Sequence, residues 1–225
     1  MTDKQKLVIF DLDYTLTKRG TWGRFMWMCL KPYPHKWMRF LAAVFIAQWR
    51  YRRGQMPRVH VKETMIRHAI KGWSQARLEC LAENFTAAEV PHKLRPGGFS
   101  ALKVHQNRGD RILIASAAAD ILVNPIAKRL GVADFVATDV AWSSDSKLET
   151  RFASGNCYGK EKLYRVMAWM ESKGLDKENL HITTYSDSHA DIPLFEFSDL
   201  VVAVAPSRKL KVHTQAQSWQ IVDWG

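Results

Sequence analysis

The stretch VIFDLDYTLT, residues 8–17, decides the fold class. Three apolar residues run directly into Asp11 and Asp13, and hydroxyls follow at Thr15 and Thr17. A short continuous apolar run is typical of a strand that is covered on both faces of a sheet. Because side chains two residues apart on an extended chain point the same way, both carboxylates can face one site where the strand ends.

The close spacing of Asp11 and Asp13 is an electrostatic problem. Two neighbouring carboxylates do not both stay ionised without a cation, so either one is protonated or a metal ion holds the pair. A strand-end turn that uses Asp for local hydrogen bonds is the structural alternative.

Four further apolar runs are typical of buried strands, and helical patterns separate them. The runs are RILIAS (111–116), DFVATDV (134–140), HITTYSD (181–187) and LVVAVA (200–205), and the helical patterns cover 97–108, 119–130, 160–173 and 190–197. Strands that alternate with helices predict a parallel sheet with helices on both faces. We therefore expect an α/β fold, a Rossmann-like doubly wound parallel sheet, with its ligand site beyond the carboxyl ends of the strands.

Residues 19–92 interrupt this alternation. They are rich in Trp, Met, Phe and Arg, show no strand-like pattern and predict several helices. The alternation resumes at Arg95-Pro96-Gly97-Gly98. The sequence thus predicts a catalytic core of residues 1–18 and 93–225, and an all-helical cap of residues 19–92 inserted after the first strand.

The most apolar part of this predicted cap is WMRFLAAVFIAQW, residues 37–49. It is shorter than the roughly 20 apolar residues that span a bilayer. A buried cap helix and a helix lying in a membrane surface, with Trp and Arg at the headgroups, are both compatible with it.

Charge and cysteine content narrow the partners and the compartment. The net charge is +11 and the pI is near 9.7, which indicates anionic partners or substrates. No zinc-finger or RNP-like motif is present, so nucleic acid is not expected. The three Cys form no CxxC pair, and the first apolar run is too short for a signal peptide, so a cytoplasmic protein is expected.

A second acidic pair follows a second predicted strand. YSDSHAD (185–191) contains Asp187 and Asp191. Two parallel strands that each end in paired Asp make a hard-oxygen site suited to Mg²⁺, which is often shared with a substrate phosphate.

Two further stretches carry candidate phosphate ligands. Ser116 ends the run RILIAS, where a hydroxyl and free N–H groups before a helix can form a phosphate cradle; a simple helix N-cap is the alternative. GKEKL (159–163) places Lys160 and Lys162 at the start of a helix, where cations are disfavoured and a lysine often has a local role. Solvated surface lysines are the alternative.

Taken in their order along the chain, these four elements resemble the motifs of the haloacid dehalogenase superfamily of phosphatases. The motifs are DLDYTLT (11–17), ILIAS (112–116), Lys162 within CYGKEKL, and YSDSHADIPL (185–194). The resemblance covers nearly the whole chain, including the helical insert between the first two motifs. It implies a Mg²⁺-dependent phosphomonoester hydrolase that acts through an aspartyl-phosphate.

The resemblance also implies a role for each acidic residue. Asp11 would be the nucleophile, and Asp13 the general acid that protonates the leaving alcohol and then the base that activates water. Mg²⁺ would be held by the Asp11 carboxylate, the Asp13 backbone carbonyl and Asp187.

The remaining motif residues would bind or support the phosphoryl group. Ser116 and Lys162 would bind its oxygens, while Thr15 and Asp191 would support the site. Lys162 is preferred to Lys160 because Cys157, Gly159 and Lys162 match the spacing Cys-x-Gly-x-x-Lys of a family subgroup.

The helical cap and the last motif resemble the phosphoserine-phosphatase-like subfamily with a C1-type cap. Within it, several pieces resemble bacterial phosphatidylglycerophosphatases of the C type: TWGRF (21–25), GWSQARLECLAENF (72–85), CYGKEKL (157–163), YSDSHADIPLFEF (185–197) and APSRKL (205–210). The lipid phosphatases carry a longer apolar stretch where residues 37–49 are short and broken by Arg39.

The substrate therefore stays open at this point. It is phosphatidylglycerophosphate or a similar lipid phosphate, or a small soluble phosphomonoester; a basic binding protein without turnover is the alternative of another class. Arg24 and Arg50 are candidates to meet an anionic substrate. A peripheral contact with an anionic membrane at its inner face accompanies the lipid alternative.

Overall fold

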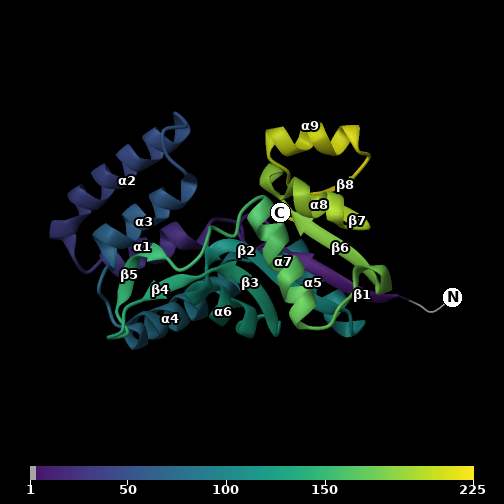
Figure 1. Ribbon diagram of the computed structural model, residues 1–225, viewed down its shortest axis with the longest axis horizontal. Helices are drawn as coiled ribbons and strands as arrows, with labels where there is room; N and C mark the ends of the chain where they lie inside the picture. Colours follow the sequence, from purple (N-terminus) through teal and green to yellow (C-terminus); the bar gives the residue numbers. More distant parts are fainter. Residues whose placement is uncertain (1–3) are drawn as a thin grey trace.

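The computed structural model describes residues 4–225, and its centre is one six-stranded parallel sheet (Figure 1). The strand order is β3-β2-β1-β6-β7-β8. The strands are β1 (Gln5–Phe10), β2 (Arg111–Ala119), β3 (Asp134–Thr138), β6 (Leu180–Ser186), β7 (Leu200–Val204) and β8 (Gln220–Val222). The predicted α/β fold class is confirmed; residues 1–3 of the predicted core lie outside the described part.

Two apolar layers cover the sheet, because alternate residues of a buried strand point to opposite faces. Val8 and Phe10 of β1 pack with residues of α5 and α6, whereas Leu7 and Ile9 pack with residues of α7 and α8. A smaller cluster joins β7 to α9. The helices are α5 (Pro96–Asn107), α6 (Asp120–Arg129), α7 (Lys160–Ser172), α8 (Ile192–Phe197) and α9 (Arg208–Ala216).

Strand register brings the motif residues to one edge. β1 lies between β2 and β6, and Phe10 is paired with Ile114 on one side and with Tyr185 on the other. The residues that follow these positions leave the sheet at its carboxyl edge, where ligands bind in open α/β sheets. The predicted motifs therefore meet at this edge.

Four helices lie between β1 and α5: α1 (Thr21–Leu30), α2 (Trp37–Arg52), α3 (Arg58–Ala69) and α4 (Gln75–Lys93). They enclose their own apolar cluster around Phe25, Met26, Ile66 and Phe85. Figure 1 shows these helices gathered at one end of the molecule, with α2 at the outer edge.

An antiparallel hairpin of β4 (Val140–Trp142) and β5 (Leu148–Phe152) adds to this cluster. The expectation of one strand over 134–140 is corrected here, because β3 ends at Thr138 and β4 begins at Val140. Val140 and Leu148 are buried among the helical residues, so part of the cap cluster comes from outside residues 19–92. The division at residues 19 and 92 stays a prediction.

The last elements of the described chain complete the sheet. The sequence patterns did not predict α9 and β8; β8 pairs with β7 as the edge strand. Trp224 then packs against Phe10 and Tyr185. Within residues 4–225, none of the helices is both long enough and apolar enough to cross a bilayer.

Candidate active site

A pocket of about 260 Å³ lies at the carboxyl edge of the sheet. It contains side chains from all four sequence motifs. The lining residues are Asp11, Asp13, Tyr14, Arg58, Ser116, Ala117, Tyr158, Lys162, Asp187, Ser188, His189, Asp191 and Ser207. The structure thus collects in one cavity residues that lie far apart in the chain.

Lys162 is the electrostatic centre of the pocket. Its Nζ donates to Asp11 Oδ1 and to Asp191 Oδ2, each at 2.8 Å, and its side chain is only 2% exposed. Buried ammonium groups require such partners, because an unpaired charge away from water is costly. Despite its burial, the two carboxylates raise the pKa of Lys162, so it stays a cation.

Asp11 is held between this cation and further acids. Burial raises the pKa of Asp11 to about 8, and Asp191 and Asp187 add to the shift, whereas Lys162 opposes it. Burial likewise raises the pKa of Asp187 to about 6, with a further contribution from Asp191. In the absence of a second cation, Asp11 therefore retains a proton near neutral pH.

The arrangement of the acids fits a hard divalent cation. The Thr15 hydroxyl lies 3.3 Å from Asp11 Oδ2 and 3.2 Å from Asp187 Oδ1, and it accepts the Asp187 N–H at 3.0 Å. Asp191 Oδ1 is buried without a hydrogen-bond partner. Among residues 4–225 no three acid, His or Cys side chains form a metal cage by themselves. Mg²⁺ keeps several waters and needs only one or two carboxylates.

Asp13 is separate from this cluster. Its Oδ1 accepts the backbone N–H of Thr21, the first residue of α1, at 2.9 Å. Burial raises the pKa of the Asp13 carboxyl, and the bond to Thr21 opposes the shift. A carboxyl with a raised pKa is suited to proton donation at neutral pH.

The loop between Asp13 and α1 has an unusual backbone. Tyr14 adopts φ = +67°, a conformation in which glycine is unstrained and a bulky residue is not. The Arg95 Nε–H donates to the Tyr14 carbonyl at 3.0 Å. This contact holds the turn that carries Asp13 into the pocket.

Ser116 is fully buried on β2, where its hydroxyl accepts the N–H of Ala118 at 3.1 Å. It lines the pocket, although β2 continues to Ala119 instead of ending at Ser116. Lys160, the alternative to Lys162, is exposed on the first turn of α7. The geometry distinguishes the two lysines clearly.

The two cap arginines predicted to meet substrate do not line this pocket. Arg24 pairs with Glu89 of α4, and its Nε–H donates to Gly20 O at 3.1 Å. Arg50 lies exposed on the last turn of α2. Arg24 is thus paired within the cap and Arg50 is exposed to solvent, and a contact of either residue with substrate stays a prediction.

Two cations of α3 lie at the pocket or beside it. Arg58 of α3 lines the pocket and lies over the Tyr158 ring at 4.7 Å. One turn further along α3, Lys62 Nζ donates to Asn156 Oδ1 at 2.6 Å and to the Ala117 carbonyl. Burial lowers the pKa of Lys62 to about 8. The i, i+4 spacing of two cations on one helix face was a signal for this pair in the sequence.

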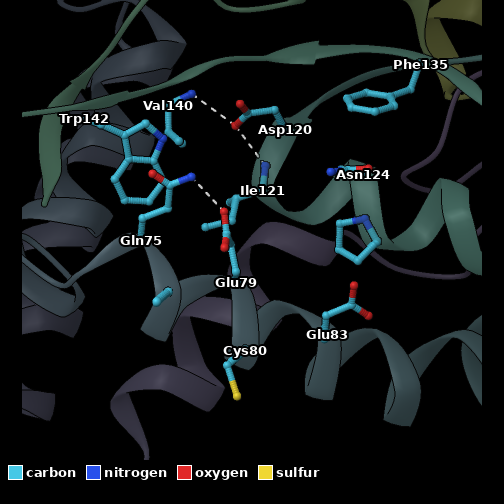
Figure 2. Close-up of a pocket in the computed structure, with 12 residues that line it drawn as sticks. Gln75, Glu79, Cys80, Glu83, Asp120, Ile121, Asn124, Phe135, Val140 and Trp142 are labelled. Carbon is cyan, nitrogen blue, oxygen red and sulfur yellow. Dashed lines mark hydrogen bonds between the residues drawn. The ribbon is translucent and has the colours of Figure 1, made fainter. Parts of the chain in front are cut away.

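A second cavity, of about 600 Å³, lies between α4, α6 and β4 (Figure 2). It shares no lining residue with the first. One of its acids, Asp120, uses Oδ1 to accept the N–H groups of Ile121 and Val140 at 2.8 and 3.1 Å. Glu79 and Glu83 are exposed. This cavity lacks the buried cation and polar convergence of the Asp11 pocket.

Comparison with known proteins agrees with this geometry. A family model for haloacid dehalogenase-like hydrolases matches residues 8–196. Protein CicA of Caulobacter vibrioides is 27% identical over 195 residues, which cover 86% of this chain and 83% of CicA. Phosphoserine phosphatase SerB1 of Mycobacterium tuberculosis is 28% identical over 155 residues, which cover 69% of this chain and 49% of that protein.

A solved structure shares the whole fold. The crystal structure of a protein of unknown function from Bordetella pertussis superposes with a TM-score of 0.88 at 25% identity. The match covers 99% of this chain and 100% of the other. The cap helices and the catalytic edge thus belong to one shared architecture.

Proposed function

The chain belongs to the haloacid dehalogenase-like hydrolase family, and within this family we propose that it is a Mg²⁺-dependent phosphomonoester hydrolase that works through an aspartyl-phosphate. The observation that carries the proposal is the contact of Lys162 with both Asp11 and Asp191 beside Ser116 in one pocket. This arrangement offers a nucleophile next to groups that stabilise phosphoryl oxygens.

In the first proposed step, an Asp11 oxygen attacks phosphorus while the bond from phosphorus to the alcohol oxygen breaks. Asp13 gives its proton to the departing oxygen. Lys162 and Ser116 hold the phosphoryl oxygens, so that charge which develops there meets fixed partners.

In the second step, Asp13 takes a proton from water, and the water oxygen attacks phosphorus. The bond between phosphorus and Asp11 breaks, which releases inorganic phosphate and returns Asp11 to its carboxylate form. Asp13 thereby regains the proton it gave away.

Mg²⁺ would be held by the carboxylates of Asp11 and Asp187 and by the Asp13 carbonyl, and it would offset the negative charge shared by nucleophile and phosphate. Asp191 and Thr15 would keep these metal-binding oxygens in position. The unpartnered Asp191 Oδ1 supports this proposal, because it can accept a hydrogen bond from a metal-bound water.

The metal requirement can be tested with a generic aryl phosphate. We expect turnover with Mg²⁺ and its loss in the presence of EDTA. Asp187→Asn should raise the Mg²⁺ concentration for half-maximal activity by about 10-fold or more, because it removes one anionic ligand. Asp145→Asn, an exposed acid in the β4–β5 turn, is the matched control. Equal activity with and without metal would exclude the proposed cofactor.

The leaving-group side of the pocket favours anionic substrates. Among residues 4–225 the only acids that line the pocket are the four motif aspartates, whereas Arg58 and His189 line it from the cap and the last motif. An ammonium group on the leaving alcohol would find no spare carboxylate there. We therefore propose a phosphomonoester whose alcohol carries a second anion.

Phosphoglycolate and phosphoethanolamine make a matched substrate pair, since both have two carbons and differ in the charge of the far group. Arg58→Gln should lower kcat/KM for phosphoglycolate by about 10-fold, because a charge-assisted hydrogen bond is lost. It should leave phosphoethanolamine nearly unchanged. Arg67→Gln, on the same helix but outside the pocket, is the control. A uniform loss on both substrates would contradict the anion preference.

A lipid phosphate is the second candidate substrate. A phosphatidylglycerophosphate-like molecule carries a phosphodiester anion near its phosphomonoester, which also suits Arg58. A cytoplasmic location is part of the proposal; the three free cysteines, two of them buried, suit a reducing compartment. Peripheral contact with an anionic membrane at its inner face accompanies the lipid candidate.

A further inference from the structure

The outer face of α2 is apolar and exposed. Met38, Leu41, Phe45 and Trp49 follow one another at helical spacing and are 81%, 51%, 73% and 44% exposed. Ile46 extends this face at 54% exposure. A contiguous set of large apolar side chains in water is unusual in a protein surface and marks an interaction site. We call these five residues the α2 face.

The other side of α2 is buried against the rest of the cap. Phe40 and Ala47 are buried, and Phe40 belongs to the cap cluster, on which Trp37 and Val44 also pack. α2 therefore has apolar side chains on both sides, although only one side is covered. Packing of the cap does not explain the α2 face.

The segment of the chain that contains α2 carries only positive charges. From Tyr14 to Lys62, with Lys62 included, the sequence has eleven Lys and Arg and no Asp or Glu. This equals the net charge of +11 for the whole chain, so the other residues balance one another. The excess positive charge of the protein is thus concentrated in the segment that contains α2.

The cations on and beside α2 are free to meet a partner. Within residues 4–225, none of Arg39, Arg50, Arg52 and Arg53 forms an ion pair, and all four are exposed. Arg53 lies over the Trp49 ring at 4.0 Å. An arginine and a tryptophan in this arrangement suit the boundary between polar headgroups and acyl chains.

We infer that the α2 face docks on the surface of an anionic lipid bilayer. The apolar side chains would enter the acyl boundary, and the flanking arginines would meet the headgroups. A second copy of this chain is disfavoured, since a symmetric contact would join two copies of α2, a helix with three arginines and no acid. A nucleic acid would use the cations and leave Met38 and Phe45 without a partner.

The α2 face provides a surface for the peripheral membrane contact named above with the lipid candidate, and its docking does not depend on the proposed chemistry. Within the described residues, none of α2 lines the Asp11 pocket. Figure 1 shows α2 at the outer edge of the cap. A bilayer on the α2 face would therefore hold the enzyme at the membrane without covering its pocket.

Sedimentation with vesicles tests the inference. The intact protein should sediment with vesicles of equal parts phosphatidylglycerol and phosphatidylcholine, and stay in solution with phosphatidylcholine alone. Added salt should weaken the binding, because headgroup attraction is screened. The double variant Met38→Ser, Phe45→Ser should lower partition by about 10-fold or more, because apolar insertion is lost.

The controls separate membrane docking from a general effect of losing exposed apolar surface and from binding of polyanions through charge alone. Met167→Ser, Val212→Ser changes two exposed apolar residues on α7 and α9 and should bind vesicles like the wild type. Aryl phosphate turnover should be equal in both double variants, so a failure of catalysis is read separately. Three results would each overturn the inference. The intact protein could fail to sediment with vesicles at low salt, or the Met38→Ser, Phe45→Ser variant could bind vesicles as well as the wild type. The protein could also prefer duplex DNA, with the same affinity in that variant.

Discussion

Replacing Asp11 by Asn is expected to lower kcat for an aryl phosphate by about 10⁴-fold or more, because the variant has no carboxylate to form the aspartyl-phosphate. The folded state should persist. Asn has the shape of Asp, and burial already raises the pKa of Asp11 to about 8, so a neutral side chain relieves part of the burial cost. Lys162 keeps its contact with Asp191 at 2.8 Å.

The covalent intermediate gives this prediction a second readout. Acid-quenched wild-type protein should carry one phosphoryl group on the peptide that contains Asp11, and Asp11→Asn should carry none, as measured by mass spectrometry. Asp13→Asn is the informative comparison, because it keeps the nucleophile and removes the proton donor. It should form and lose the intermediate slowly. Normal turnover in Asp11→Asn, or a phosphoryl group on another peptide, would exclude Asp11 as the nucleophile.

The meeting of the motif residues at one edge of the sheet could be predicted from the sequence for a simple physical reason. Apolar runs such as VIF before Asp11 and ILIA before Ser116 indicate buried parallel strands, and parallel strands place their carboxyl ends together. The sequence separates Lys162 from Lys160 less clearly, because both lysines lie at the start of the same predicted helix. Only the packing of α7 shows that Lys162 is buried and Lys160 is exposed.

The cap was harder to predict because α2 has large apolar side chains on its exposed side as well as on its buried side. The predicted run 37–49 shows which residues are apolar, but not which side of α2 the cap cluster covers. For the same reason Arg50 could not be distinguished from Arg58, which α3 directs into the pocket. The sequence pattern does not predict the β4–β5 hairpin, because its strands are short and the apolar run 134–140 covers β3 and the first residue of β4.

Removal of the Lys162 ammonium is expected to affect both stability and catalysis. Lys162→Met keeps the length of the side chain but leaves Asp11 and Asp191 without their buried cation. Breaking a buried ion pair on one side costs about 3–5 kcal/mol of unfolding free energy. Loss of a phosphoryl-oxygen ligand should lower kcat by about 10³-fold. Lys160→Met, on the same helix turn but exposed, should change neither.

The pH dependence distinguishes a charge effect from a packing effect. In metal-free protein the pKa values of Asp11 and Asp187, about 8 and about 6, are raised above the unfolded value of 3.8, so the folded state holds protons that the unfolded state releases. Stability therefore falls as pH rises from about 4 toward 8. Without Lys162, whose charge lowers both pKa values, this fall becomes steeper.

Urea unfolding in EDTA at pH 5 and pH 8 measures the difference. The difference in unfolding free energy between wild type and Lys162→Met should be larger at pH 8. At this pH the buried carboxyls of the variant either ionise without a cation or keep protons that the unfolded chain releases, and both cost stability. An equal gap at both pH values would mean that Lys162 acts through the packing of its aliphatic stem. Its ammonium, bonded to Asp11 and Asp191, would then be dispensable for the fold, and the charge balance proposed for the pocket would be wrong.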